Sequence, residues 1–115
     1  RSFEDSLQSR WKQDTVTDKP RLKLNIGGQE FEVASATLGN ADAGSLLAAL
    51  ASPRPPMDSD PSGAFFFDRD WWQFRLVLQF LREGDACLPA AKAVLKQLYR
   101  EAAFWRLPSL QDAVR

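Results

Sequence analysis

The sequence contains 115 residues, of which 44% are hydrophobic and 11% aromatic, and it carries 15 basic and 15 acidic side chains. This composition is typical of one folded domain with a single core. The net charge is zero, whereas a nucleic-acid-binding protein usually has an excess of basic residues. Histidine is absent, which excludes imidazole acid–base catalysis, Ser-His or Cys-His nucleophile pairs and imidazole metal sites. A single cysteine allows neither an internal disulfide nor a structural zinc site. We therefore expect no cofactor and no metal.

The same features constrain the cellular context. A lone cysteine favours an intracellular protein, and we predict a cytoplasmic location. No apolar run approaches the roughly 18–20 residues that span a bilayer, and no secretory signal is visible, so we expect no membrane contact by this domain. The first residue is Arg1 rather than Met, which indicates a piece of a longer protein.

Residues 1–20 are predicted to form an N-terminal helical extension and a linker. Phe3, Leu7 and Trp11 lie four residues apart, which is the spacing of one side of a short helix. Such a helix is marginal in water unless it packs on something, so it is either a docking element for a partner or a clasp onto its own domain. Residues 13–20 are polar and end in Asp-Lys-Pro, which suits a linker.

Two alternating runs then predict a β-hairpin. Apolar and polar residues alternate over 22–26, and after Gly27 and Gly28 the apolar Phe31 and Val33 alternate with glutamates. The glycine pair fits the turn because both residues can take a positive φ. A glycine pair can also cradle a phosphate, but neither a third glycine nor a Lys-Ser/Thr pair follows, so we prefer the hairpin.

Two short helices and a loop are predicted next. Ser35 is expected to cap a single turn through Leu38, and Asp42 to cap a second helix. The inward residues of that second helix are three leucines, Leu46, Leu47 and Leu50. Residues 52–63 contain four of the seven prolines and so form a loop, which is either a surface connection or a proline-rich ligand for a small recognition module.

The stretch from Phe65 to Gly84 has the most complete set of secondary-structure signals in the sequence. A short apolar run and three charged residues precede a helix with a continuous apolar stripe at i, i+3, i+4 and i+7, formed by Phe74, Val77, Leu78 and Leu81. Asp70 is expected to be the N-cap, with Gln73 as its capping-box partner. Gly84 is expected to end the helix in a left-handed conformation.

The C-terminal third is predicted to be mainly helical. A brief strand is one option for residues 86–88, and a helix follows over residues 91–105 with five inward residues, Val94, Leu95, Leu98, Ala102 and Trp105. Lys92, Lys96 and Arg100 lie four apart on its outer side, a pattern more typical of a solvated face than of a binding stripe. Pro108 suits the first position of a last helix, whose stripe is Leu110, Ala113 and Val114.

The side chains with catalytic potential have simpler structural interpretations. Cys87 has no basic neighbour in the sequence and lies in a semi-apolar segment, so we expect a buried, unreactive thiol. Asp68 and Asp70 have the residue types of a catalytic carboxylate pair, but Arg69 separates them and Asp70 is the predicted N-cap. We therefore predict that the chain is not an enzyme.

Three segments occur in an order that matches one known family. They are LKLNIGGQEFEVASATL (22–38), GAFFFDRDWWQFRLVLQFLREG (63–84) and LYREAAFWRLPSL (98–110). Residues 21–115, which contain all three, resemble the BTB/POZ domain in its potassium-channel tetramerisation form, shared by voltage-gated channels and the soluble KCTD proteins. The ending EAAFWRLPSL is more similar to the KCTD type. The resemblance implies an α+β fold, in which a small sheet with an N-terminal hairpin is flanked by a cluster of α-helices. The motif residues that it assigns to this framework are Gly27, Gly28, Phe31, Phe74 and Gly84.

The resemblance also implies a function. Domains of this family are protein-interaction modules that form homo-oligomers, here expected to be a tetramer or a pentamer. A KCTD-type adaptor that recruits a cullin ubiquitin ligase is the first hypothesis for the partner. The alternatives are the cytoplasmic assembly domain of a voltage-gated potassium channel and a scaffold domain of a large complex. The His/Cys zinc site found between the subunits of some channel domains has no counterpart here.

The oligomer interface is predicted at the central charged turn. Its residues are Asp68, Arg69, Asp70, Trp71 and Trp72. The family usually has proline after Asp-Arg-Asp, whereas this sequence has two tryptophans. Two adjacent tryptophans near a helix start cannot both face one core, so either one of them lies at an interface or the local geometry differs from that of the family. Tryptophan is also enriched at interface hot spots. The alternative is that Asp68 and Arg69 pair within one chain and stabilise the turn.

Overall fold

The computed structural model describes residues 20–115, and the helix expected within residues 1–20 lies outside them. The described part begins with a hairpin formed by β1 (Arg21–Ile26) and β2 (Gln29–Ala34). The two strands run antiparallel, and their turn is Gly27-Gly28, with φ values of 59° and 101° that favour glycine. The predicted hairpin is therefore confirmed.

A third strand, β3 (Ala64–Phe67), completes the sheet on the other side of β1. It runs parallel to β1, with Leu24 opposite Phe65 and Ile26 opposite Phe67, so the strand order is β2-β1-β3. Parallel neighbours need a long crossover connection. Here the crossover contains α2 (Ser35–Leu38), α3 (Leu46–Leu50) and the proline-rich loop.

The caps of these two short helices differ from the prediction. Ser35 is the first helical residue of α2 rather than its cap, because Ala34 holds the N-cap position without a side-chain hydrogen bond. The N-cap of α3 is Ser45, whose hydroxyl accepts a hydrogen bond from the backbone N–H of Ala48 at 3.2 Å. The expectation that Asp42 caps this helix was wrong.

Asp42 instead connects the crossover to the C-terminal helix. Its Oδ2 accepts a hydrogen bond from the hydroxyl of Ser109 at 2.6 Å and another from the backbone N–H of Ser109 at 3.2 Å. A local sequence pattern could not show this contact, because the two residues are 67 positions apart.

The long helix α4 (Trp71–Glu83) follows β3 and matches its predicted stripe, since Phe74, Val77, Leu78 and Leu81 are all buried. Asp70 caps it by accepting a hydrogen bond from the backbone N–H of Trp72 at 2.9 Å. Gln73 is not the capping-box partner: it is buried, and its amide donates to Oε1 of Gln97 at 2.6 Å. Gly84 ends the helix with a φ of 74°, which favours glycine, but its ψ of −159° differs from the left-handed conformation that was predicted.

The remaining elements form the C-terminal part of the domain. A 3-10 helix, η1 (Gly84–Cys87), occupies most of the segment for which a brief strand had been one option, so that option was wrong. α5 (Lys92–Trp105) and α6 (Pro108–Val114) follow, and Pro108 takes the first position of α6 as predicted. Arg106, between them, has a φ of 59°, and this left-handed residue turns the chain between the two helices.

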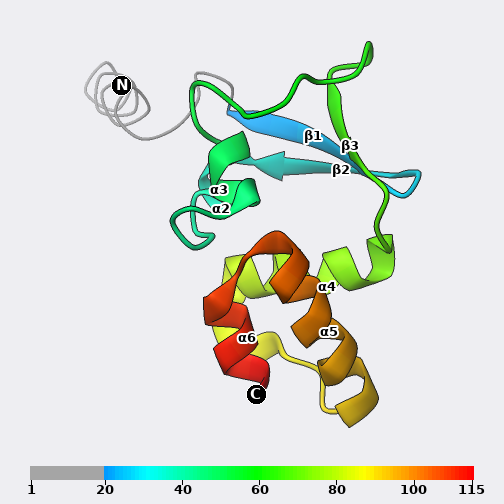
Figure 1. The fold of residues 1–115 in the computed structure, drawn as a ribbon, viewed down its shortest axis with the longest axis vertical. Helices are drawn as coiled ribbons and strands as arrows, with labels where there is room; N and C mark the ends of the chain where they lie inside the picture. The colour runs from blue at the N-terminus through cyan, green and yellow to red at the C-terminus, as the bar shows by residue number, and fades with distance from the viewer. Residues whose placement is uncertain (1–19) are drawn as a thin grey trace, which may run out of the picture.

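Figure 1 shows the sheet above a cluster formed by α4, α5 and α6, with α2 and α3 beside the sheet. Aromatic rings join these layers. Phe74 contacts Phe31 of the hairpin at 5.4 Å between ring centroids and Trp105 of α5 at 5.1 Å, and Trp105 contacts Phe67 of β3 at 4.9 Å. The α+β architecture that the sequence predicted is confirmed. None of the helices in the described part is long and apolar enough to cross a membrane.

Candidate interaction surface

The charged turn between β3 and α4 is held against the hairpin by backbone contacts. The carbonyl oxygen of Phe67 accepts hydrogen bonds from the backbone N–H groups of Gly27 at 2.8 Å and Arg69 at 2.9 Å. A Cβ atom on Gly27 would collide with the backbone carbonyl oxygen of Arg69. Gly27 therefore has two roles: it forms the hairpin turn, and it allows the next turn to approach closely.

Arg69 is anchored inside its own chain by Glu101 of α5. The guanidinium donates Nη2–H to Oε1 of Glu101 and Nε–H to Oε2 at 3.3 Å, a two-point contact that fits the planar guanidinium group. Oε2 of Glu101 also accepts a hydrogen bond from the indole N–H of Trp105 at 3.2 Å. The Glu101 side chain is only 8% exposed, against 32% for Arg69, so the carboxylate depends on these donors.

The guanidinium group of Arg69 also covers an exposed aromatic ring. Its Cζ lies 4.0 Å from the centroid of Phe104, within the range of a cation–π contact. Phe104 in turn packs edge-to-face on Trp105 at 4.9 Å. Arg69 therefore links the turn, the end of α5 and the aromatic core.

Arg69 has a partner within the chain, as the alternative interpretation required, but the carboxylate is that of Glu101 rather than Asp68. Asp68 and Asp70 are both exposed. Asp70 retains its capping role, while Asp68 places a negative charge on the surface beside it. The two aspartates are thus available to solvent or to a neighbouring molecule.

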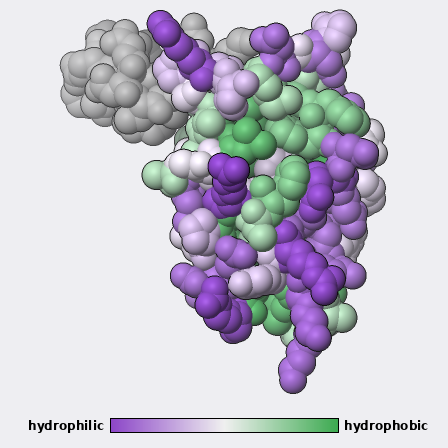
Figure 2. All heavy atoms as spheres, in the orientation of Figure 1, coloured by the Kyte–Doolittle hydropathy of each residue, from purple (hydrophilic) through white to green (hydrophobic). Residues whose placement is uncertain are grey.

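Large apolar side chains gather around this turn. Five large hydrophobic side chains are exposed among the described residues, and four of them lie near the turn. Phe66 is in the strand before the turn, Trp71 and Trp72 begin the helix after it, and Phe104 is the ring that Arg69 covers. Their exposed fractions are 50% for Phe66, 42% for Trp71, 39% for Trp72 and 44% for Phe104. Trp72 also lies under the guanidinium of Arg75, at 5.2 Å. Figure 2 shows hydrophobic residues collected on the upper part of the visible face, over the sheet.

Glu101 and Phe104 were not among the predicted site residues. A signal for Glu101 was present, since it lies on the inward side of α5, next to Ala102 and four residues before Trp105. A carboxylate at such a position requires a buried donor. No comparable signal marks Phe104, because a single exposed phenylalanine is normal on protein surfaces.

Cys87 differs from the buried thiol that the sequence predicted. It is partly exposed, and its thiol donates a weak hydrogen bond to the carbonyl oxygen of Gly84 at 3.2 Å. Partial burial, helped by the negative charge of Glu83, raises the pKa of the thiol above its ordinary value. A thiol that is protonated at neutral pH is a poor nucleophile. In the described part of the chain no three His, Cys, Asp or Glu side chains form a group that could hold a metal ion.

Comparison with known proteins identifies the family. The family model of the BTB/POZ domain matches residues 22–113. This chain belongs to the BTB/POZ family. Among its relatives, BTB/POZ domain-containing protein KCTD21 of Homo sapiens is 35% identical over 94 residues, which is 82% of this chain and 36% of KCTD21. Potassium channel regulatory protein of Mus musculus is 38% identical over 100 residues, covering 87% of this chain and 35% of the relative. The chain thus spans about a third of the length of these relatives.

Membership of the family confirms the resemblance to the KCTD type. It makes the chain a protein-interaction domain of a family whose members typically self-associate. The exposed aromatic residues around the charged turn are the features of the described surface that best fit such a role.

Proposed function

We propose that this domain forms a closed cyclic homo-oligomer, a tetramer or a pentamer, through a head-to-tail contact centred on the turn between β3 and α4. The observation that carries the proposal is the concentration of exposed aromatic residues at this turn. Trp71 and Trp72 supply the apolar contact area, and large aromatic side chains of this kind dominate the binding energy of interfaces. A head-to-tail contact closes into a ring when the rotation between neighbours allows it.

The charged residues of the turn have different roles in this interface. Asp68 and Asp70 are exposed at its rim, where a charge mainly steers partners and sets their orientation. Arg69 acts from inside the subunit, because its guanidinium is already bound to Glu101 and covers Phe104. It keeps the turn and the neighbouring aromatic rings in one conformation, and such preorganisation lowers the entropic cost of association.

Light scattering on the whole chain tests the ring. We expect a mass of four or five subunits at tens of micromolar, and smaller but folded species for Trp71→Ala and Trp72→Ala. Tyr99→Ala is the matched control, because Tyr99 is the exposed aromatic residue of α5 that lies away from the turn, at 37% exposure. A monomeric parent chain would overturn the ring, and tryptophan variants that assemble like the parent would overturn this interface.

Two charge variants distinguish the role of Asp68 at the rim of the interface from the role of Arg69 inside the subunit. Asp68→Lys reverses an exposed rim charge and should weaken assembly while leaving the fold intact. Arg69→Glu would place a second carboxylate against the buried Glu101, so it is expected to damage the fold itself. Circular dichroism of both variants distinguishes dissociation from unfolding.

For the whole protein we propose the role of a KCTD-type adaptor in the cytoplasm, which presents a partner-binding surface and recruits a cullin ubiquitin ligase. Two facts support it: the likeness to KCTD21 and the family's use of this domain for protein contacts. Calorimetric titration with the N-terminal domain of a cullin is the direct test. Saturable binding that is lost in the dissociated tryptophan variants supports the adaptor, and an absence of binding by an intact ring rejects it.

A role in potassium-channel assembly is the second candidate, since the relative named potassium channel regulatory protein is 38% identical over 100 residues. The discriminating experiment is co-purification with the cytoplasmic assembly domain of a voltage-gated potassium channel. Mixed oligomers would favour this role, whereas exclusive self-association would favour the adaptor.

A further inference from the structure

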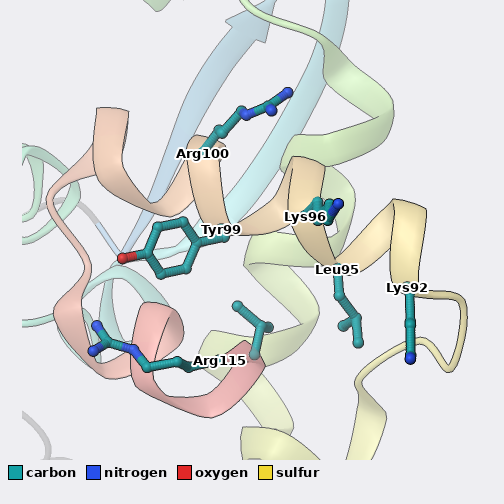
Figure 3. Close-up of a pocket in the computed structure, with 7 residues that line it drawn as sticks. Lys92, Leu95, Lys96, Tyr99, Arg100 and Arg115 are labelled. Atoms are coloured by element: carbon teal, nitrogen blue, oxygen red, sulfur yellow. The ribbon is translucent and has the colours of Figure 1, made fainter.

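The outer side of α5 and the end of α6 enclose a groove on a different part of the domain. The groove has a volume of about 700 Å³, and its described lining is Lys92, Leu95, Lys96, Tyr99, Arg100, Val114 and Arg115. Figure 3 shows Leu95 and Tyr99 between α5 and α6, with Lys92 and Arg115 on either side of them, while Arg100 points the other way. The groove is built within one chain and does not depend on the proposed ring.

The charge of this groove is entirely positive. Four of its seven described lining residues are cations, and the other three are Leu95, Tyr99 and Val114. The nearby Asp112 forms an ion pair with Arg115 at 3.5 Å, but both side chains are well exposed and the pair is therefore weak. An anionic ligand would gain from Lys92 and Lys96 without meeting a carboxylate of the described lining.

The floor of the groove is apolar, and this changes the interpretation of the basic residues on α5, Lys92, Lys96 and Arg100. The sequence alone favoured a solvated face, but Leu95 and Tyr99 lie on the same side of α5 as Lys92 and Lys96, at the i, i+3, i+4 and i+7 positions of one helical face. Arg115 adds its guanidinium 5.8 Å from the Tyr99 ring. A purely solvated lysine face would not need such a floor.

We propose that this groove binds an acidic amphipathic helix of a partner protein. The lysines at positions 92 and 96 are spaced about 6 Å apart along α5, which matches two carboxylates four residues apart on a partner helix. Leucine-like residues of the same partner helix would pack on Leu95, Tyr99 and Val114, as in other helix-in-groove complexes. A nucleic acid fits less well, because its phosphates would find an apolar floor and the whole chain has no net positive charge.

Tyr99 offers a direct probe, because it is the only tyrosine of the chain. Incorporation of 3-fluorotyrosine into the whole chain gives one ¹⁹F NMR signal, located in the groove. The probe ligand is a synthetic 16-residue helical peptide with leucines on one stripe and glutamates beside it. We expect a saturable shift of this signal that weakens as salt is raised. A glutamate–glycine peptide of equal charge should give no saturable shift.

A matched pair of variants tests the role of charge. Lys96→Glu should weaken binding by roughly fivefold to tenfold, since an attraction becomes a repulsion. It should leave the helix intact, because the new glutamate lies four residues from both Lys92 and Arg100. Arg54→Glu makes the same change of net charge in the exposed proline-rich loop and should leave binding unchanged.

Three outcomes would overturn the proposal. They are equal weakening by Arg54→Glu, an equal response of the ¹⁹F signal to a single-stranded oligonucleotide, and a signal that moves with protein concentration alone. The second outcome would assign the groove to nucleic acid, and the third would assign it to a contact between copies of this chain.

Discussion

At the scale of single residues, the two glycines of the hairpin turn have unequal constraints. Both have a positive φ, but only Gly27 faces a backbone atom of another segment, the carbonyl oxygen of Arg69. Around Gly28 nothing lies within 4 Å of an added Cβ. The position of the turn between β3 and α4 therefore depends on Gly27 more than on Gly28, although the sequence marked the two alike.

This difference predicts unequal losses of stability. Gly28→Ala should cost about 1–2 kcal/mol of unfolding free energy, the strain of a left-handed alanine. Gly27→Ala adds a steric clash and should cost about 3 kcal/mol or more. Urea unfolding followed by tryptophan fluorescence measures both values, and equal losses would contradict the close approach of the turn at Arg69.

The pair formed by Arg69 and Glu101 predicts an asymmetry between its two partners. Arg69→Ala leaves a carboxylate buried with Trp105 as its remaining described donor, and it should cost about 2–4 kcal/mol after allowance for the partial exposure of Arg69. Glu101→Gln removes the charge from the buried position and leaves a guanidinium that can reach water, so about 1–2 kcal/mol is expected. Chemical denaturation of both variants provides the check, and the reverse order would show that Arg69 is the more dependent partner.

At the scale of elements, the end of the proline-rich loop is tied down by Asp60. Its Oδ1 accepts hydrogen bonds from the hydroxyl of Ser62 at 2.6 Å, the backbone N–H of Ser62 at 2.9 Å and the backbone N–H of Ala64 at 3.0 Å. These bonds, above all that from the Ser62 side chain, lower the pKa of Asp60 below its ordinary value. The hydrogen bonds of Asp60 thus fix the backbone from Ser62 to Ala64, where β3 begins.

A lowered pKa in the folded state has a definite effect on stability. The contribution of Asp60 is fully present above the pKa of the unfolded chain, and it is lost as the pH falls through the lower folded value. Asp60→Asn, which keeps the acceptor oxygen, should make unfolding less sensitive to acid between neutral pH and about pH 3. Asp58→Asn is the control in the same loop. Equal effects of the two variants would contradict a special role of Asp60.

Two hydrogen-bond acceptors near α3, Ser45 and Asp42, give a further prediction. Ser45→Ala removes an N-cap and should cost about 1 kcal/mol. Asp42→Ala should lose a similar amount, but through its contact with Ser109, so its effect and that of Ser109→Ala should be non-additive. A double-mutant cycle measures this coupling, and strict additivity would remove the link between the crossover and α6.

These cases show which elements a sequence can predict. The hairpin and α4 were predictable because their determinants are local: alternation, a glycine pair, and an apolar stripe between Asp70 and Gly84. The roles of Asp42 and Gln73 were not, because each contacts a residue far along the chain. The same holds for the site. The turn was recognisable from its motif, and the position of Glu101 marked a buried carboxylate, but its pairing with Arg69 followed only from the placement of α5 beside the turn.

At the scale of the whole molecule, a ring would couple stability to concentration. Assembly of folded subunits draws the equilibrium away from the unfolded chain, so Tm should rise as the protein concentration increases. Trp71→Ala should abolish this rise without lowering the Tm of the dilute chain by a comparable amount, since Trp71 is exposed in the single subunit. Differential scanning calorimetry over a hundredfold range of concentration checks it. A Tm independent of concentration for the parent chain would contradict the proposed assembly.

The parallel pairing of β1 with β3 also matters while the chain is being made. The ribosome releases the hairpin first, and Ile26 lies 41 positions before its sheet partner Phe67. At synthesis rates of about 5–20 residues per second, the inner strand waits about 2–8 s for its second neighbour. During that interval the open edge of β1 is able to pair with another nascent chain. The length of the crossover therefore sets how long this edge of β1 stays unpaired on each growing chain.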